Sequence, residues 1–245
     1  MATTSNGLVY RDVHCHLLPG IDDGCKSAEE SIAIMKTAKQ NGVETIVATP
    51  HYYPNETIAE FLARRTQAEN ILAEAVLTND FNRPALLRGA EVAYHNGLIY
   101  DEDLAELCIG SSEYMLLELP FVPWTGNVLS DVRNFYTSRG IIPIIAHLER
   151  YLDIQDKHVV DELLDCDVLI QMNAGYITDK ASKRHAKKML KDGVVDLLGS
   201  DSHNMSHRPP NLHLGFEQIL DWKMYDIAER LCKNAEMITN LKRRS

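Results

Sequence analysis

Seven short apolar runs, separated by stretches with helical patterning, constrain the fold of this chain more than any other feature. Continuously apolar strands are buried on both faces, as in parallel sheets, and repeated strand–helix units favour an α/β barrel or a doubly wound sheet. No glycine-rich dinucleotide-binding or phosphate-binding loop follows any run, so the nucleotide-binding version of the sheet has no support. The runs span residues 8–13, 45–49, 85–92, 113–119, 141–147, 167–173 and 195–201.

Helices are expected between these runs. Ser27 is a good N-cap with Glu30 three residues further on, which is a capping-box pattern, and this helix should stop at Asn41-Gly42. The basic stretch 183–191 is typical of a helix with a solvated face. The other helices are expected over about 58–77, 128–139, 214–220 and 224–241.

The composition is that of an ordinary globular protein. The chain has 245 residues, 45% of them hydrophobic, without linker, low-complexity run or repeat, so we expect residues 1–245 to form one domain. A net charge of −10 argues against nucleic acid or an anionic membrane surface as the main partner. Five scattered cysteines without a CxxC pair indicate reduced thiols in a cytoplasmic protein. No apolar run approaches the roughly 20 residues of a membrane span, and the start lacks the apolar stretch of a signal peptide.

Acidic side chains and histidines mark the carboxyl ends of six of the seven runs, whereas the sixth run ends in Gln171 and Asn173. In α/β barrels these strand ends build the active site. Imidazole and carboxylate without thiolate suit Mn, Fe, Zn or Mg rather than a soft metal. The candidate residues are His14, His16, Asp22, Asp23, His51, Glu91, Glu118, His147, Asp201 and His203.

The first run continues into the stretch DVHCHLLPGIDDG, which concentrates this chemistry. Side chains alternate along a strand, so His14 and His16 point to the same side and can bind one ion. Cys15 points the other way and is expected to be a small buried hydrophobe. The loop then returns a carboxylate over the site, with Asp23 as the expected ligand and Asp22 as the alternative.

Each of these pieces has a plainer explanation when taken alone, such as a satisfied histidine, a helix cap or a salt bridge. Their coincidence at one end of one sheet is what favours a metal site. Glu149 is expected to be structural, and the histidines away from the strand ends are expected at the surface. Three interpretations stay open for the apolar stretch 119–125: a lip that faces the substrate, a contact in a homo-oligomer, or simple packing. The histidines expected at the surface are His95, His158, His185 and His213.

The segments DVHCHLLPGIDDG, ATPHYYPN, GAEVAY, LLELP, AHLERY and SDSHNMSHRPP follow one another along nearly the whole chain. Together they resemble the PHP (polymerase and histidinol phosphatase) superfamily, and more narrowly the bacterial manganese-dependent protein-tyrosine phosphatases of capsule and exopolysaccharide loci. The resemblance implies a distorted (β/α)7 barrel, similar to a TIM barrel, that holds three divalent ions, with Mn²⁺ expected and Fe, Zn or Mg as alternatives. The metal ligands that it implies are His14, His16, Asp23, His51, Glu91, Glu118, His147, Asp201 and His203.

The same resemblance implies a catalytic role in phosphate binding for Arg150 and Arg208, and a substrate that is the phosphotyrosine-rich tail of a tyrosine autokinase governing polysaccharide synthesis. The expected reaction is direct attack of a metal-bridged hydroxide on phosphorus. Glu91 is then the bridging carboxylate, and Asp201 or His203 could supply a proton to the leaving group. The few residues ahead of the first motif stay unassigned.

Three rival functions remain. A histidinol-phosphate phosphatase or another small-molecule phosphomonoesterase would use the same metals with a different pocket. An amidohydrolase barrel also opens with HxH, but this chain has Glu118, and no lysine at any strand end, where that family usually places a metal-bridging lysine. A binding module that has lost the chemistry would lack several of the ligands, and here none is missing.

Overall fold

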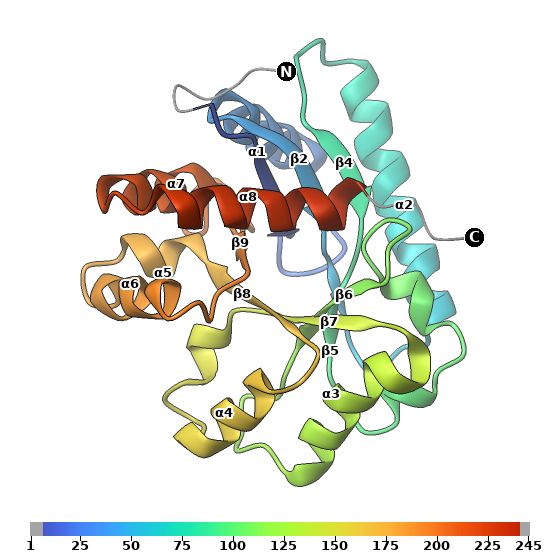
Figure 1. The fold of residues 1–245 in the computed structure, drawn as a ribbon. Coiled ribbons are helices and arrows are strands. Elements are labelled where there is room, and N and C mark those ends of the chain that lie inside the picture. The colour runs from blue at the N-terminus through green and yellow to red at the C-terminus, as the bar shows by residue number, and fades with distance from the viewer. Residues whose placement is uncertain (1–6, 241–245) are drawn as a thin grey trace.

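A curled sheet of parallel strands forms the centre of this computed structural model, which describes residues 7–240 (Figure 1). The unassigned residues 1–6 and the last residue of the helix expected over 224–241 therefore lie outside the described part. All the strand pairs are parallel, as the apolar runs predict. The strands are β1 Tyr10–Cys15, β2 Val43–Ala48, β3 His51–Tyr52, β4 Ala85–Arg88, β5 Glu91–Ala93, β6 Tyr114–Glu118, β7 Ile142–Ile145, β8 Leu169–Asn173 and β9 Leu197–Gly199.

The strands form two connected sheets, with the orders β1-β2-β4 and β3-β5-β6-β7-β8-β9. Two of the predicted runs are interrupted: two residues separate β2 from β3, and Gly89-Ala90 separates β4 from β5. A Cβ on Gly89 would lie 2.9 Å from the Val47 side chain, so the break falls where two strands approach closely. Nine strands in the described chain therefore stand where the sequence predicted seven.

Strand β1 also lies against the end of β9, which curls the sheet back toward its start. Cys15 and Ser202 form an isolated parallel bridge, and the His16 amide donates to the Ser202 carbonyl at 2.8 Å. The buried Asp12 carboxylate accepts hydrogen bonds from the amides of Ser200 at 2.9 Å and His14 at 3.3 Å. These contacts bring the carboxyl ends of the first and last strands together.

Eight α-helices of the described chain pack around the sheet, the last two of them following the final strand (Figure 1). Ser27 caps α1 as predicted, but the Glu30 carboxylate accepts from the Lys26 amide instead of completing a capping box. Thr57 and Glu60 form a complete capping box at the start of α2. The helices are α1 Ala28–Gln40, α2 Ile58–Leu77, α3 Gly126–Arg139, α4 Lys157–Leu164, α5 Ala174–Thr178, α6 Lys183–Lys191, α7 Leu212–Asp221 and α8 Tyr225–Asn240, with short 3-10 turns at η1 Leu98–Tyr100, η2 Leu104–Leu107 and η3 Leu148–Tyr151.

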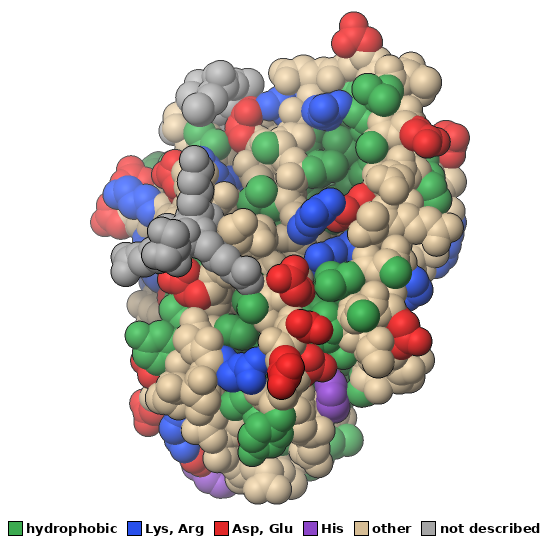
Figure 2. All heavy atoms as spheres, turned by 90° about the vertical axis from the view of Figure 1, so that its right-hand side faces the viewer, with side chains coloured by type: hydrophobic (Ala, Val, Ile, Leu, Met, Phe, Trp, Pro, Cys, Tyr) green, Lys and Arg blue, Asp and Glu red, His purple; other side chains and the backbone are tan. Residues whose placement is uncertain are grey.

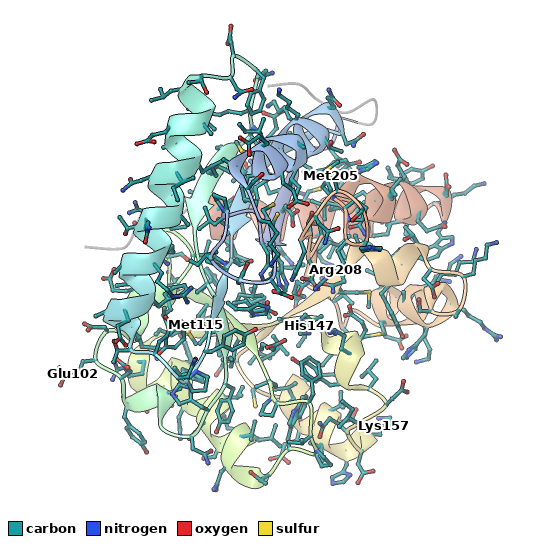
Figure 3. All side chains as sticks on the ribbon, turned by 180° about the vertical axis from the view of Figure 1, so that it is seen from behind. Glu102, Met115, His147, Lys157, Met205 and Arg208 are labelled. Carbon is teal, nitrogen blue, oxygen red and sulfur yellow. The ribbon has the colours of Figure 1, made fainter. Side chains whose placement is uncertain are left out.

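A small apolar cluster inside the curl joins the strands to α8. Val13, Leu116 and Ile144 contribute to it from the strands, and Ala235 and Ile238 contribute from the helix. Helix α8 crosses the front of the sheet in Figure 1, whereas His147 and Arg208 lie near the centre of the opposite view in Figure 3. The cluster therefore supports the strands on which the candidate site is built.

Charges of both signs are interspersed on the face shown in Figure 2, which is the right-hand side of Figure 1. Arg88 and Glu69 form one such pair at 2.7 Å. Opposite charges at this spacing neutralise one another locally.

No helix within residues 7–240 is long and apolar enough to span a bilayer.

Candidate metal centre

The nine predicted ligand residues converge at one end of the sheet, where His51 and Glu91 lie just beyond β2 and β4 as the first residues of the short strands β3 and β5. Six of the nine residues are almost fully buried, whereas 63% of the Asp23 side chain is exposed. Eight of the nine belong to clusters whose donor atoms lie within 4.8 Å of one another, and the ninth, His147, contacts Glu91. The clusters are His16, Asp23, His51 and His203; His14, His16 and Asp201; and His51, Glu91 and Glu118.

The Glu91 carboxylate lies at the centre of the group. One of its oxygens is 3.0 Å from His16 Nε2 and 3.2 Å from both His14 Nε2 and His51 Nδ1. The other oxygen is 2.8 Å from His147 Nε2. Four imidazole nitrogens around one buried carboxylate are more donors than this side chain needs for its hydrogen bonds. A carboxylate in this position can also bridge cations.

Several ring nitrogens in the site face one another or face no donor. His14 Nε2 and His16 Nε2 lie 3.1 Å apart. His51 Nδ1 and His147 Nδ1 are buried without a hydrogen-bond partner among the described residues, although His51 Nδ1 lies near Glu91. Buried polar groups are normally paired. Convergent lone pairs and carboxylates without thiolate fit divalent metal ions such as Mn, Fe or Zn.

The electrostatics of the site also favour bound cations. Burial lowers the pKa of His203, with help from the neighbouring His16 and Arg208, to about 4, so this imidazole is neutral, and its Nε2 accepts from the Arg208 guanidinium. Burial would lower the pKa of His16 too, but its hydrogen bonds with Asp22 and Glu91 raise that pKa to about 10. The carboxylates therefore draw positive charge into the site, which divalent ions can supply.

The two adjacent aspartates have different positions. Asp22 accepts hydrogen bonds from His16 Nδ1 at 2.8 Å, from the Gly24 amide at 2.9 Å and from the His51 amide at 3.0 Å. It therefore holds the ring of His16 from behind. Asp23 instead lies 3.4 Å from both His51 Nε2 and His203 Nε2, on the open side of the cluster. This geometry favours Asp23 over Asp22 as the ligand.

Amide side chains at the end of β8 orient further members of the cluster. Gln171 Oε1 lies 3.2 Å from His14 Nδ1 and accepts from the His147 amide at 2.8 Å. Asn173 receives a hydrogen bond from Gln171 and donates to Asp201 Oδ2, both at 2.8 Å. The sequence placed both residues at a strand end but indicated no role for them. Their position beside His, Asp and Glu strand ends was the available signal.

Backbone strain is concentrated at the site. His147 has φ 36° and Asp201 has φ 52°, which is the left-handed region that non-glycine residues rarely adopt. Both turns aim a candidate ligand into the cluster directly after its strand. Such conformations persist only where the surrounding structure enforces them, and here the His147 amide donates to Gln171 Oε1 and the Asp201 amide donates to the His14 carbonyl.

The two predicted phosphate-binding arginines differ in their surroundings: Arg208 contacts candidate ligands directly, whereas Arg150 lies over Phe121, whose ring stacks on His147. Arg208 forms an ion pair with Asp201 and lies 2.9 Å from His203 Nε2 through its guanidinium. Arg150 is exposed, and its guanidinium carbon lies 5.0 Å from the centroid of the Phe121 ring. Arg150 therefore has donors that are free to meet an anion at the mouth of the site.

The sequence also predicted two buried or structural residues and four surface histidines. Cys15 is fully buried, as expected, and Glu149 is buried with one oxygen accepting from the Asn173 amide at 3.1 Å. His158 and His185 are exposed as expected. His95 and His213 are half-buried, so for them the expected surface position is only partly right.

Known proteins match this chain along most of its length. The family described as capsular polysaccharide synthesis, CpsB/CapC, matches residues 10–240. Tyrosine-protein phosphatase CpsB of Streptococcus pneumoniae is 30% identical over 226 residues, covering 85% of this chain and 88% of that protein. Tyrosine-protein phosphatase YwqE of Bacillus subtilis (strain 168) is 30% identical over 217 residues, covering 82% of this chain and 80% of that protein.

A solved structure gives the same picture of the fold. It comes from work on YwqE of Bacillus subtilis and CpsB of Streptococcus pneumoniae, which are called unique metal-dependent tyrosine phosphatases. It superposes with a TM-score of 0.82 over 95% of both chains, at 24% identity. At this level of identity the likeness supports the α/β fold with a curled parallel sheet.

Proposed function

We infer, from the premise that this chain belongs to the CpsB/CapC family of capsular polysaccharide synthesis, that it is a metal-dependent protein-tyrosine phosphatase, a phosphoric monoester hydrolase. The family match confirms the resemblance drawn from the sequence motifs. The observation that carries the inference is the buried Glu91 carboxylate surrounded by four imidazoles, together with Arg208, which pairs with Asp201, and Arg150, which lies over Phe121. This arrangement combines cation ligands with groups that bind a phosphate.

The nine converging residues would hold divalent ions, for which we propose Mn²⁺ in three positions, with Glu91 as the bridging carboxylate. Ions in this position would supply Lewis acidity and lower the pKa of a water for in-line attack on phosphorus. The chain's own contribution is to fix the ligands. Asp22 orients His16, Gln171 orients His14, and Asn173 orients Asp201.

The arginines and the acidic end of the site would act on the substrate. Arg150 and Arg208 would bind the non-bridging phosphate oxygens, for which a guanidinium has matching donor geometry. A phenolate with a pKa near 10 is a better leaving group than an alkoxide. Asp201 and His203 would hold the water that protonates the leaving oxygen, because pKa values of about 2 and about 4 leave neither side chain as an acid near neutral pH. We expect no covalent phosphoenzyme because Cys15 is buried behind the site.

We also propose an architecture and a substrate for the whole chain. If β2 continues into β3 and β4 into β5 across their breaks, the sheet has seven strands and forms a distorted (β/α)7 barrel that closes between β1 and β9. Residues 1–245 would then form one PHP-type metallophosphatase domain. The substrate would be the phosphotyrosine tail of an autokinase that controls capsular or exopolysaccharide synthesis, reached in the cytoplasm.

Substrate and metal preference test the proposal together. Metal-stripped protein would be reconstituted separately with Mn²⁺, Mg²⁺ and Zn²⁺, and initial rates compared on a phosphotyrosine peptide, a phosphoserine peptide and histidinol phosphate. We expect Mn²⁺-dependent hydrolysis that favours phosphotyrosine. A preference for histidinol phosphate would assign the same metal chemistry to a small-molecule phosphatase. Hydrolysis that needs no metal would refute the proposed site.

A further inference from the structure

Two exposed aromatic side chains stack on imidazoles of the metal centre. The Tyr53 ring centroid lies 5.0 Å from that of His51, with the planes 22° apart, and 43% of Tyr53 is exposed. The Phe121 ring lies 5.9 Å from that of His147, with the planes 23° apart, and 44% of Phe121 is exposed. Aromatic rings of this size are costly to leave in water, so a pair of them at the mouth of a polar site points to an apolar ligand group.

The two rings approach the centre from different sides. His51, beneath Tyr53, contacts one oxygen of Glu91, and His147, beneath Phe121, contacts the other oxygen. Tyr53 follows β3 and lines a cavity of about 380 Å³ together with Asp23 and His51. Phe121 comes from the stretch 119–125 that follows β6. The rings therefore stack on imidazoles that contact the two different oxygens of the Glu91 carboxylate.

The surroundings of Phe121 hold it in this place. Its ring stacks on the buried Tyr151 at 5.1 Å, and Tyr151 is itself fixed because its hydroxyl oxygen accepts from the Leu119 amide at 3.0 Å. The guanidinium of Arg150 lies over the same ring. Phe121 and the proposed phosphate-binding residue Arg150 therefore lie against each other. An aryl phosphate needs both kinds of group, an apolar surface for its ring and a cation for its phosphate.

We propose that Tyr53 and Phe121 form a binding subsite for the phenyl ring of phosphotyrosine and thereby select aryl over alkyl phosphate esters. This inference rests on the proposed function, and it assigns the stretch 119–125 to the substrate rather than to an oligomer contact. A phenyl ring spans the gap between the phosphate and the peptide backbone and can stack between the two side chains. Phosphoserine has no such spacer, so its backbone would meet the rings instead.

The test uses Tyr53→Leu, Phe121→Leu and the double variant in the full-length, Mn²⁺-reconstituted protein. Leucine keeps apolar bulk and removes the ring. The readouts are kcat/KM on a phosphotyrosine peptide and the dissociation constants of the inhibitors phenylphosphonate, methylphosphonate and inorganic phosphate, measured by calorimetric titration. Tyr136→Leu is the matched control, because Tyr136 is a 47% exposed tyrosine on the outer helix α3.

We expect each single variant to lose about tenfold in kcat/KM on the phosphotyrosine peptide, mainly through KM, and to bind phenylphosphonate about tenfold more weakly. Binding of methylphosphonate and inorganic phosphate should stay within about twofold of wild type, since neither carries a ring. The control should match wild type throughout.

Two results would overturn the subsite, and a third would overturn the proposed function. Equal weakening of all three inhibitors would show that Phe121 acts only by positioning Arg150. Unchanged selectivity between phenylphosphonate and methylphosphonate in the double variant would show that the rings do not contact the ester group. Wild-type protein that binds phosphonates but hydrolyses no phosphomonoester with any metal would refute the proposed function separately, because the selectivity of inhibitor binding is measured without turnover.

Discussion

Replacing Asp22 with asparagine tests the claim that this side chain orients the metal centre without being a ligand. The carboxylate accepts three hydrogen bonds, two on one oxygen from His16 Nδ1 and the His51 amide, and one on the other from the Gly24 amide. An amide of the same shape has only one accepting oxygen. If that oxygen keeps the pair from His16 and His51, the Gly24 amide faces an NH₂ group and loses its partner.

The structure gives a magnitude for this loss. An unpaired buried donor costs about 1–3 kcal/mol. In a chain of this length, about 2 kcal/mol corresponds to a fall in Tm of about 4–8 °C. Loss of a partner that orients a ligand typically weakens metal binding or activity by about 10–100-fold. We therefore expect Asp22→Asn to show both effects in thermal unfolding and in Mn²⁺ titrations.

Asp23→Asn is the matched control, because the neighbouring carboxylate is 63% exposed and faces the ligand atoms of His51 and His203. Its metal-free Tm should stay within about 2 °C of wild type, since exposed substitutions cost about 0.5 kcal/mol or less. Its Mn²⁺ binding and activity should still fall. The same metal-free Tm in both variants, or wild-type Mn²⁺ affinity in Asp22→Asn, would refute the reasoning.

Three further predictions concern the loop, the anion site and the bound cations. Gly24→Ala should lower Tm by roughly 2–12 °C in differential scanning calorimetry, because the added Cβ would clash with the His16 carbonyl oxygen at a cost of about 1–3 kcal/mol. Gly126→Ala is the control, because a Cβ added at Gly126 meets open space. Arg150→Ala should weaken inhibition by inorganic phosphate about tenfold without changing the Mn²⁺ content, and loss of metal in this variant would contradict its role. Mn²⁺ at about 100 times its Kd should stabilise the chelator-treated protein by about 2.7 kcal/mol, seen as a higher Tm, and an unchanged Tm would argue against binding to the folded state.

The residue types at the strand ends made most of the candidate site predictable. Apolar runs place strands, and strand ends bring side chains such as His14, Glu91 and His147 to one edge of a parallel sheet, so a common location followed from sequence order alone. The helix over 58–77 was also predictable, because its cap at Thr57 and its period are local properties. Local pattern is informative where short-range physics decides the conformation.

Other features depend on contacts between distant segments and could not be read from local pattern. The orienting role of Gln171 depends on its distance from His14, which is 157 residues away. The left-handed conformations of His147 and Asp201 are opposed by local preference and are enforced by their neighbours. The break at Gly89 arises because another strand packs against it. The choice between Asp22 and Asp23 likewise required the path of the loop.

A Mn²⁺ titration of metal-free protein, with bound metal and phosphotyrosine hydrolysis measured in the same samples, tests the central claim most directly. We predict that phosphotyrosine hydrolysis is absent without metal, rises as Mn²⁺ binds and reaches its maximum when the proposed metal sites are filled. The same titration of His51→Ala should show fewer bound ions and no hydrolysis while the protein stays folded. Full phosphotyrosine hydrolysis by protein with no bound metal, or wild-type behaviour of His51→Ala, would contradict the account.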